Sequence, residues 1–187
     1  MKKYEFTGDT LEWYGRILNR IRALKDFGDV KAGDLGGWIE KEENLSHEGD
    51  CWVYDEAKVY NNVKIYNNVR IGGSAKIEGS AKIGGNATIK GGAVIKSTSD
   101  YITISPIGSR DDTTTAFRTA DGVIRVKCGC FYGSIDEFKR KVWETHGDNQ
   151  YGKEYLAVIE LLKVRFGENK KSPKSKRRKP LKGDKKY

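Results

Sequence analysis

Few side chains in this sequence could act as a general base. The two histidines are His47 and His146. His146 is expected to end a helix just before Gly147, where a cationic side chain suits the C-terminal end of the helix dipole. His47 is therefore the only sensible candidate for a catalytic base. Because it stands six residues before Val53, at the start of the repeat described below, it could equally cap a frayed first repeat.

The cysteines offer a second possible chemistry, metal binding. Zinc usually takes four ligands, with two or more residues between paired cysteines, whereas Cys128 and Cys130 flank a single glycine. Alternation with Ile124 and Val126 instead predicts that both thiols lie on the apolar face of a strand. With Cys51 the count is three, which is not a disulfide framework and favours a reducing, intracellular setting. We expect no metal and no cofactor.

A polar cluster follows the strand predicted to end at Pro106. Ser109 and Arg110 come just after Gly108, which permits an unusual backbone conformation. Arg110 could hold a phosphate or carboxylate through two parallel hydrogen bonds. The next two residues, Asp111 and Asp112, could equally neutralise it in a surface loop. Ser109 and Arg110 are thus candidate anion ligands, and the alternative is a surface loop in which the two aspartates neutralise Arg110.

A strict six-residue period must position these groups. Eight β-branched aliphatic residues recur at intervals of six, each preceded two positions earlier by a small or β-branched residue. The aliphatic positions are Val53, Val59, Ile65, Ile71, Ile77, Ile83, Ile89 and Ile95. Asn and Gly pairs that tolerate tight turns lie between the repeats. Such a period fits a short strand plus a turn, with each aliphatic stacked inward on its equivalent one coil away. A run of β-hairpins would instead need side chains that alternate between the two faces of each strand, without a fixed inward position every six residues.

The outward positions of the repeat suggest a second anion-binding surface. If three repeats make one coil, residues eighteen apart share a column. The basic candidates are Lys58, Lys64, Arg70, Lys76 and Lys82, and three consecutive repeats add Tyr54, Tyr60 and Tyr66. Basic and aromatic side chains together are typical of surfaces that bind nucleic acid or a nucleotide. The alternative is that lysines keep the sheet soluble and tyrosines suit strands.

This spacing resembles the hexapeptide-repeat proteins. The resemblance covers roughly 50 residues and implies a mainly β fold, a short left-handed parallel β-helix with three hexapeptides per coil, and commonly a homotrimer. Many members are acyltransferases with a catalytic histidine, a role that only His47 could take here. The predicted β-helix, however, is shorter than such enzymes usually require and has no looped-out insertion.

The flanks divide the chain into four parts. Residues 1–44 are expected to be strands and loops that cap the β-helix of residues 45–97, with a strand at 17–24 whose apolar face holds Ile17, Ile21 and Ala23, and with Trp38 available to plug the core. Residues 98–167 are expected to form a small α+β module. It comprises a strand at 101–104, a hairpin turning at Asp121-Gly122, a helix opened by the Ser134–Glu137 capping box, and a second helix closed by Gly167.

The module of residues 98–167 carries a second resemblance. Three segments, 100–110, 128–131 and 144–147, look like a module of uncharacterised phage and prophage proteins, which often follows hexapeptide repeats. The resemblance implies a mobile-element origin and, with it, the host cytoplasm as the location. It assigns no catalytic residues.

The net charge of +9 is concentrated at the C-terminus, since residues 168–187 contain ten basic and two acidic side chains. This segment is expected to be a disordered tail that contacts polyanions or simply solubilises the chain. Its candidate contacts are Lys170, Lys171, Lys174, Lys176, Arg177, Arg178 and Lys179. No apolar run approaches the roughly 18 residues that span a bilayer, so no membrane partner is expected.

These observations favour a non-enzymatic, phage-type protein that binds an anionic partner. The partner could be nucleic acid, a nucleotide or an acidic face of a host protein, and inhibition of a host defence system is a reasonable purpose. A hexapeptide-repeat acyltransferase with His47 as base is the first alternative. A structural virion or assembly protein is the second.

Overall fold

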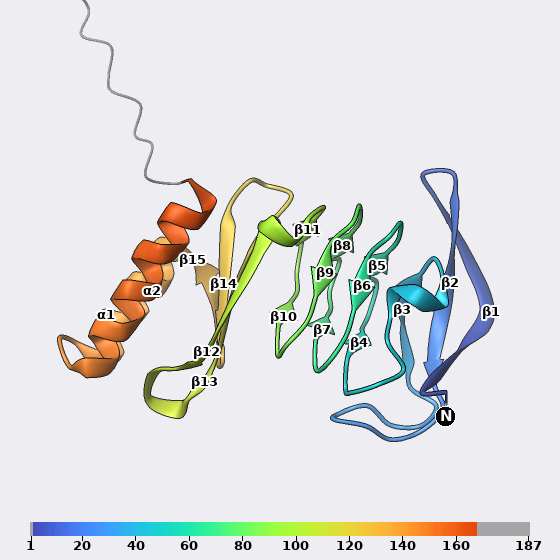
Figure 1. Cartoon of the computed structure of the whole chain (residues 1–187), viewed down its shortest axis with the longest axis horizontal. Helices are drawn as coiled ribbons and strands as arrows, with labels where there is room; N and C mark the ends of the chain where they lie inside the picture. Colours follow the sequence, from blue (N-terminus) through green and yellow to red (C-terminus); the bar gives the residue numbers. More distant parts are fainter. Residues whose placement is uncertain (1, 168–187) are drawn as a thin grey trace, which may run out of the picture.

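A computed structural model describes residues 2–167. It has three parts in a row: an N-terminal group of strands, a parallel β-solenoid of about three turns, and a sheet covered by two helices (Figure 1). The predicted fold class is confirmed, because the chain is mainly β and two helices follow the solenoid. The basic segment 168–187 lies outside the described residues.

The solenoid consists of eight two-residue strands. These are β4 (Trp52–Val53), β5 (Lys58–Val59), β6 (Lys64–Ile65), β7 (Arg70–Ile71), β8 (Lys76–Ile77), β9 (Lys82–Ile83), β10 (Thr88–Ile89) and β11 (Val94–Ile95). Each pairs in parallel with the strand eighteen residues away, as Val59 does with Ile77. Three repeats therefore make one coil, and the strands form three faces: β5-β8-β11, β4-β7-β10 and β6-β9. All eight predicted aliphatic residues are buried in one core.

Tight turns between these strands explain the Asn and Gly pairs. Asn61 and Asn67 adopt left-handed backbone angles, as do the glycines at the equivalent corners. Gly79 shows why some corners exclude a side chain, since a Cβ there would lie 2.2 Å from the carbonyl oxygen of Lys96 in the next coil. The close stacking of coils thus selects glycine at this position.

The N-terminal strands extend one solenoid face. β1 (Tyr4–Trp13) and β2 (Arg16–Ala23) form an antiparallel hairpin, and β3 (Leu35–Ile39) pairs antiparallel with β2 and parallel with β5. The result is a six-stranded sheet in the order β1-β2-β3-β5-β8-β11. A 3₁₀ turn, η1 (Glu42–Asn44), leads into the first coil.

Two details of the predicted N-terminal region are wrong. The alternation along β2 changes phase, because the β2–β3 register shifts between Arg20 and Arg22; Leu18 and Ile21 are both buried, whereas Ile17 is 55% exposed. Trp38 does not plug the core either. It points outward, where its indole N–H donates to Glu56 at 3.0 Å.

The open end of the first coil is filled by other residues. Tyr4, Ile21 and Trp52 are buried there together with the side chain of Lys3. The Lys3 ammonium donates to the carbonyl oxygens of Cys51 at 2.8 Å and Gly49 at 3.2 Å. Burial lowers the pKa of Lys3, and these carbonyl bonds partly replace the water that the ammonium has lost.

The C-terminal module is a four-stranded antiparallel sheet with two helices. Its strands, in spatial order, are β12 (Tyr101–Ile107), β13 (Asp112–Arg118), β14 (Ile124–Cys128) and β15 (Phe131–Ser134). β12 continues through Pro106, and β15 was not predicted. Two 3₁₀ turns, η2 (Thr98–Asp100) and η3 (Gly108–Arg110), precede and follow β12.

The first helix begins and ends where the sequence predicts, and the second ends at the predicted Gly167. α1 (Ile135–His146) opens with the Ser134–Glu137 capping box, and Gly147 ends it. α2 (Gln150–Phe166) is capped by the Asn149 side chain, which accepts from the Gly152 N–H at 3.0 Å, and Gly167 closes it in a left-handed conformation. No helix within residues 2–167 is long and apolar enough to cross a membrane.

The module sheet separates two hydrophobic cores. On β13, Phe117 packs into the solenoid core, whereas its neighbour Ala116 belongs to the core beneath the helices. Alternation along one strand therefore seals the last coil on one face and holds the helices on the other. The Thr88 N–H donates to Thr115 Oγ1 at 3.2 Å, and Ala93 bridges to Thr119. Figure 1 shows the helices on the side of the sheet away from the solenoid.

Candidate anion-binding pocket in the C-terminal module

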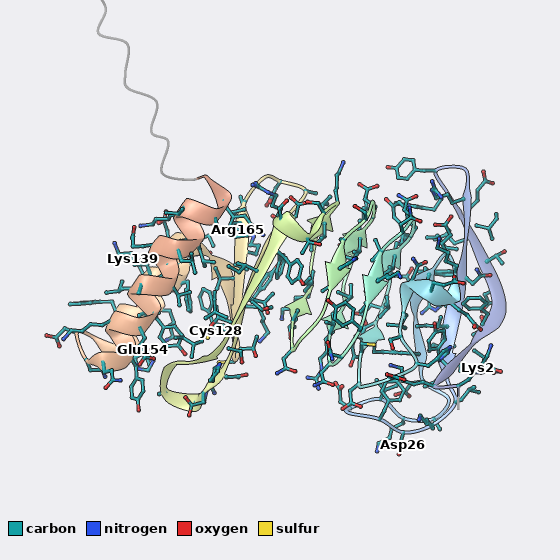
Figure 2. The ribbon with its side chains drawn as sticks, viewed as in Figure 1. Lys2, Asp26, Cys128, Lys139, Glu154 and Arg165 are labelled. Atoms are coloured by element: carbon teal, nitrogen blue, oxygen red, sulfur yellow. The ribbon has the colours of Figure 1, made fainter. Side chains whose placement is uncertain are left out.

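A pocket of about 360 Å³ opens in the C-terminal module. Its lining comes from four places: η3, the adjoining ends of β14 and β15 with the turn between them, one face of α1, and α2. In Figure 2, Cys128 marks the sheet side of this region and Glu154 marks α2. The volume is within the range of roughly 300–1,000 Å³ that is usual for small-molecule sites.

Arg110 is held in this pocket by two glycines. Gly108 has a φ of +73°, and a Cβ there would lie 1.9 Å from the Tyr155 hydroxyl. The Gly108 N–H donates to Glu154 on α2 at 3.2 Å, which fixes η3 against the helix. Gly129 has a φ of +53°, and a Cβ there would lie 1.9 Å from Nη2 of Arg110. The guanidinium therefore lies directly against the backbone of the β14–β15 turn.

The neighbouring aspartates do not neutralise Arg110 in the structure. Asp112 accepts from the N–H of Thr113, and Asp111 takes a left-handed conformation that ends η3. Within residues 2–167, the Arg110 guanidinium has no hydrogen bond or ion pair with any side chain. Both Ser109 and Arg110 are exposed at the pocket.

The two pocket cysteines differ from each other. Cys128 is half-buried at the end of β14, and its thiol donates to the Tyr155 hydroxyl at 3.7 Å. Cys130 is exposed in the turn, so the expectation of two buried thiols on one strand face is wrong for Cys130, because β14 ends before it. Burial and this thiol contact raise the pKa of Tyr155, which therefore remains a protonated phenol. No group of three metal-ligating side chains exists among the residues that the structure describes.

Aromatic rings form one wall of the pocket. Phe131 lies 5.2 Å from Phe138, Phe138 lies 5.6 Å from Tyr155, and Tyr155 lies 5.6 Å from His146, measured between ring centroids. His146 thus ends its helix as predicted but also faces the pocket. Lys141 on α1 adds a second cation.

The charges in the lining have one sign. Arg110 and Lys141 are cations, and the described residues that line the pocket include no aspartate or glutamate. Lys141 pairs at 3.7 Å with Glu144, which lies on α1 outside the lining, so Arg110 carries the uncompensated charge. Ser109, Thr145 and Tyr155 add hydroxyl donors. An oxyanion, which only accepts hydrogen bonds, matches this set of groups.

The pocket also joins the three segments of the phage-type resemblance. Ser109 and Arg110 come from the first segment, Cys128, Cys130 and Phe131 from the second, and Thr145 and His146 from the third. Lys141, Phe138 and Tyr155 were not predicted at the site, and the two rings also belong to the core beneath the helices. The spacing of residues 138, 141, 142 and 145 along one helix face could have identified Lys141.

His47 lies at a second cavity, also about 360 Å³, at the first coil. Its ring stacks on Tyr4 with centroids 4.3 Å apart, and its Nδ1 accepts the N–H of Lys3 at 3.1 Å. Burial lowers the pKa of His47. A neutral ring whose Nδ1 accepts a hydrogen bond carries its proton on Nε2. Nε2 itself is buried with no hydrogen-bond partner among the described residues. In this arrangement neither nitrogen can accept a proton from a substrate.

The basic candidates of the solenoid are spread over three faces. Lys58 and Lys76 lie against the Trp13 ring, at 4.8 and 5.1 Å from its centroid, on the six-stranded sheet. Arg70 is on a second face, paired with Asp29 at 3.3 Å. Lys64 and Lys82 are on the third face. They therefore do not form one surface.

The three solenoid tyrosines are also divided. Tyr54 donates to Asp29 at 2.8 Å and Tyr60 donates to Glu78 at 2.9 Å, so both hydroxyls are occupied. Tyr66 is partly exposed on the third face beside Gly84. The tail candidates, residues 170–179, lie outside the described residues.

Comparison with known proteins gives one local similarity. A stretch of 43 residues, 23% of this chain, is 49% identical to the uncharacterized acetyltransferase YdcK of Escherichia coli (strain K12). The match takes in only 13% of that protein's length. No protein-family profile matches the chain. Together, the solenoid and this similarity fit a hexapeptide-repeat protein.

Proposed function

We propose that this chain is a non-enzymatic binding protein that captures a small anionic ligand in the C-terminal pocket. The observation that carries the proposal is the Arg110 guanidinium, which faces a pocket without acidic lining residues and has no ion pair among the described residues. Anion binding supplies the missing counter-charge. The solenoid acts as a rigid support whose last coil fixes the module sheet.

The backbone around Arg110 favours binding over a role in stability. Gly108 and Gly129 both have positive φ angles and close contacts that a side chain would prevent. Gly108 lies against Tyr155, and Gly129 lies against Arg110. A guanidinium already held against a turn loses little freedom when it binds a carboxylate or phosphate. The same side chain without a ligand gains no ion-pair energy.

The biological setting that we propose follows from the phage-type resemblance. A phage protein that holds a small anion could withdraw it from a host defence system, and the host cytoplasm would be its location. A homotrimer, the usual state of hexapeptide-repeat proteins, would present three such pockets. Neither the trimer nor the setting is needed for the binding itself.

Calorimetric titration of the full-length protein with inorganic phosphate, pyrophosphate, citrate and adenosine monophosphate tests the proposal. At least one of these anions should bind, and Arg110→Met should weaken it about tenfold or more, the value of a charge-assisted hydrogen bond. Arg140→Met is the matched control, because Arg140 is an exposed α1 residue that does not line the pocket. Binding that is equal in both variants would refute a site at Arg110.

A second candidate, a hexapeptide-repeat acyltransferase, is favoured by the similarity to YdcK. In that reading His47 is the base at the cavity of the first coil, near Glu42 and Tyr66. The Lys3 N–H on Nδ1 opposes this role unless Lys3 moves away when substrate binds. Incubation with acetyl coenzyme A and an amine panel would favour catalysis if turnover occurs and His47→Ala abolishes it. Turnover that persists in His47→Ala would exclude this base.

A further inference from the structure

We infer that the ligand of the C-terminal pocket is a mononucleotide, a planar aromatic base joined to a phosphate. The inference rests on the proposed anion-binding function and adds the identity of the non-ionic part of the ligand. It comes from the division of the pocket into an aromatic wall and a cationic rim.

The aromatic wall is larger than an anion alone requires. Phe131, Phe138, Tyr155 and His146 form a continuous series of rings with neighbouring centroids 5.2–5.6 Å apart. The first and last of them are only partly buried, so ring surface remains open to the pocket. Val142 completes the apolar side. Aromatic side chains of this kind stack on nucleobases without strong preference for one base.

The two cations of the pocket come from two different elements. Arg110 comes from η3, whereas the rings come from β15 and the two helices, and Lys141 shares α1 with Phe138. A ligand that satisfies both parts has an apolar planar end and an anionic end. A phosphate would meet the guanidinium through two parallel hydrogen bonds, while Lys141 would add a point charge.

The size of the pocket sets an upper limit on the ligand. A volume of about 360 Å³ is near the lower end of the small-molecule range of roughly 300–1,000 Å³. One base with its sugar and phosphate suits such a space, and a folded polynucleotide does not. The site is therefore distinct in kind from the non-specific contacts expected of the basic C-terminal segment.

The test compares four ligands on the full-length protein: adenosine monophosphate, ribose 5-phosphate, adenosine and inorganic phosphate. Adenosine monophosphate should bind about tenfold or more tightly than ribose 5-phosphate, because only the former can stack. Phe131→Leu should reduce that difference, because it removes a partly buried ring of the aromatic wall. Trp143→Leu is the control, since Trp143 is a 62% exposed aromatic residue of α1 outside the pocket lining.

The results distinguish the mononucleotide inference from the proposal that the pocket binds an anion. Equal affinity for adenosine monophosphate and ribose 5-phosphate would overturn the mononucleotide inference and leave anion binding intact. Failure of every anion to bind would overturn both. Thermal melting of each variant verifies its fold, and Phe131→Tyr, which retains the ring, should keep the preference for the base.

Discussion

The solenoid and the C-terminal module use their residues in opposite ways. In the solenoid each repeat places an aliphatic side chain in the core, and many outward polar groups already have partners, as Arg70 has Asp29. The module instead keeps an unpaired guanidinium beside open volume and places glycines where side chains would close the site. Regular repetition therefore provides stability and position, and the irregular part provides the candidate binding site.

The largest expected effect is on the solenoid core. Ile83→Ala removes a fully buried side chain from a stacked column and should lower the free energy of unfolding by about 2–5 kcal/mol. Lys82→Ala, at the exposed neighbouring position, should stay within about 0.5 kcal/mol. Denaturant unfolding measures both. If the two variants lost equal stability, the inward column would not be the main source of solenoid stability.

The second effect contrasts two glycines with the same backbone angle. Gly108 and Gly85 have φ values of +73° and +72°, but a Cβ would strike the Tyr155 hydroxyl at Gly108 and would meet nothing within 4 Å at Gly85. Both alanine variants should lose roughly 1–2 kcal/mol from the left-handed conformation. Gly108→Ala should lose roughly 1–3 kcal/mol more through overpacking and should weaken anion binding. Equal losses, with binding preserved in both, would contradict the role of Gly108 at the pocket.

A smaller effect is expected at the start of α1. Ser134→Ala removes the side chain that accepts the Glu137 N–H and should cost about 0.5–2 kcal/mol. Ser80→Ala, in a solenoid turn, should change stability by less than about 0.5 kcal/mol. Chemical unfolding monitored by helical circular dichroism reports both. A larger loss of unfolding free energy in Ser80→Ala than in Ser134→Ala would contradict the stabilising role of the helix cap.

The smallest effect concerns pH and the N-terminal sheet. Burial opposes ionisation of Glu40, but the Asn61 N–H and Arg16 outweigh it, so the pKa of Glu40 is lowered. The Trp38 N–H and Arg20 lower the pKa of Glu56 in the same way. A carboxylate with a lowered folded-state pKa stabilises the fold above its unfolded pKa of about 4.3 and loses that contribution as pH falls through the folded value.

The protection factors of the β2 and β3 amides, which correct each exchange rate for the intrinsic rate at that pH, should therefore fall as the pH drops below about 4.3, before those of β8 and β9 do. The Glu40→Gln, Glu56→Gln double variant should show a weaker pH dependence in the same strands. If its pH dependence matched that of the wild type, these two carboxylates would not be the groups that couple the N-terminal sheet to the solenoid.

The sequence predicts the repetitive part far better than the site. A period of six predicts the inward column and the turns, because every repeat gives the same local signal. The number of repeats per coil comes from the resemblance to hexapeptide-repeat proteins. The helix start at Ser134 follows from capping chemistry that is equally local. The phase change in β2 could not be predicted, since it depends on pairing with β3 across a register shift.

Ser109 and Arg110, candidate anion ligands from the sequence, line the candidate pocket, and their role there stays a prediction. The open question was whether Asp111 and Asp112 neutralise Arg110, and local sequence cannot answer it because the direction of η3 depends on its contact with α2. Phe131, Lys141 and Tyr155 join the pocket through tertiary packing. Cys130 was misplaced because the strand ends two residues earlier than its alternation suggests.

The most direct test of the central claim is amide hydrogen exchange of the full-length protein with and without saturating adenosine monophosphate. We expect slower exchange in residues 108–110 and 128–131 and in the second half of α1, with the solenoid strands β4–β11 unchanged. Protection confined to the solenoid faces, or no protection anywhere, would contradict a binding site in the C-terminal module.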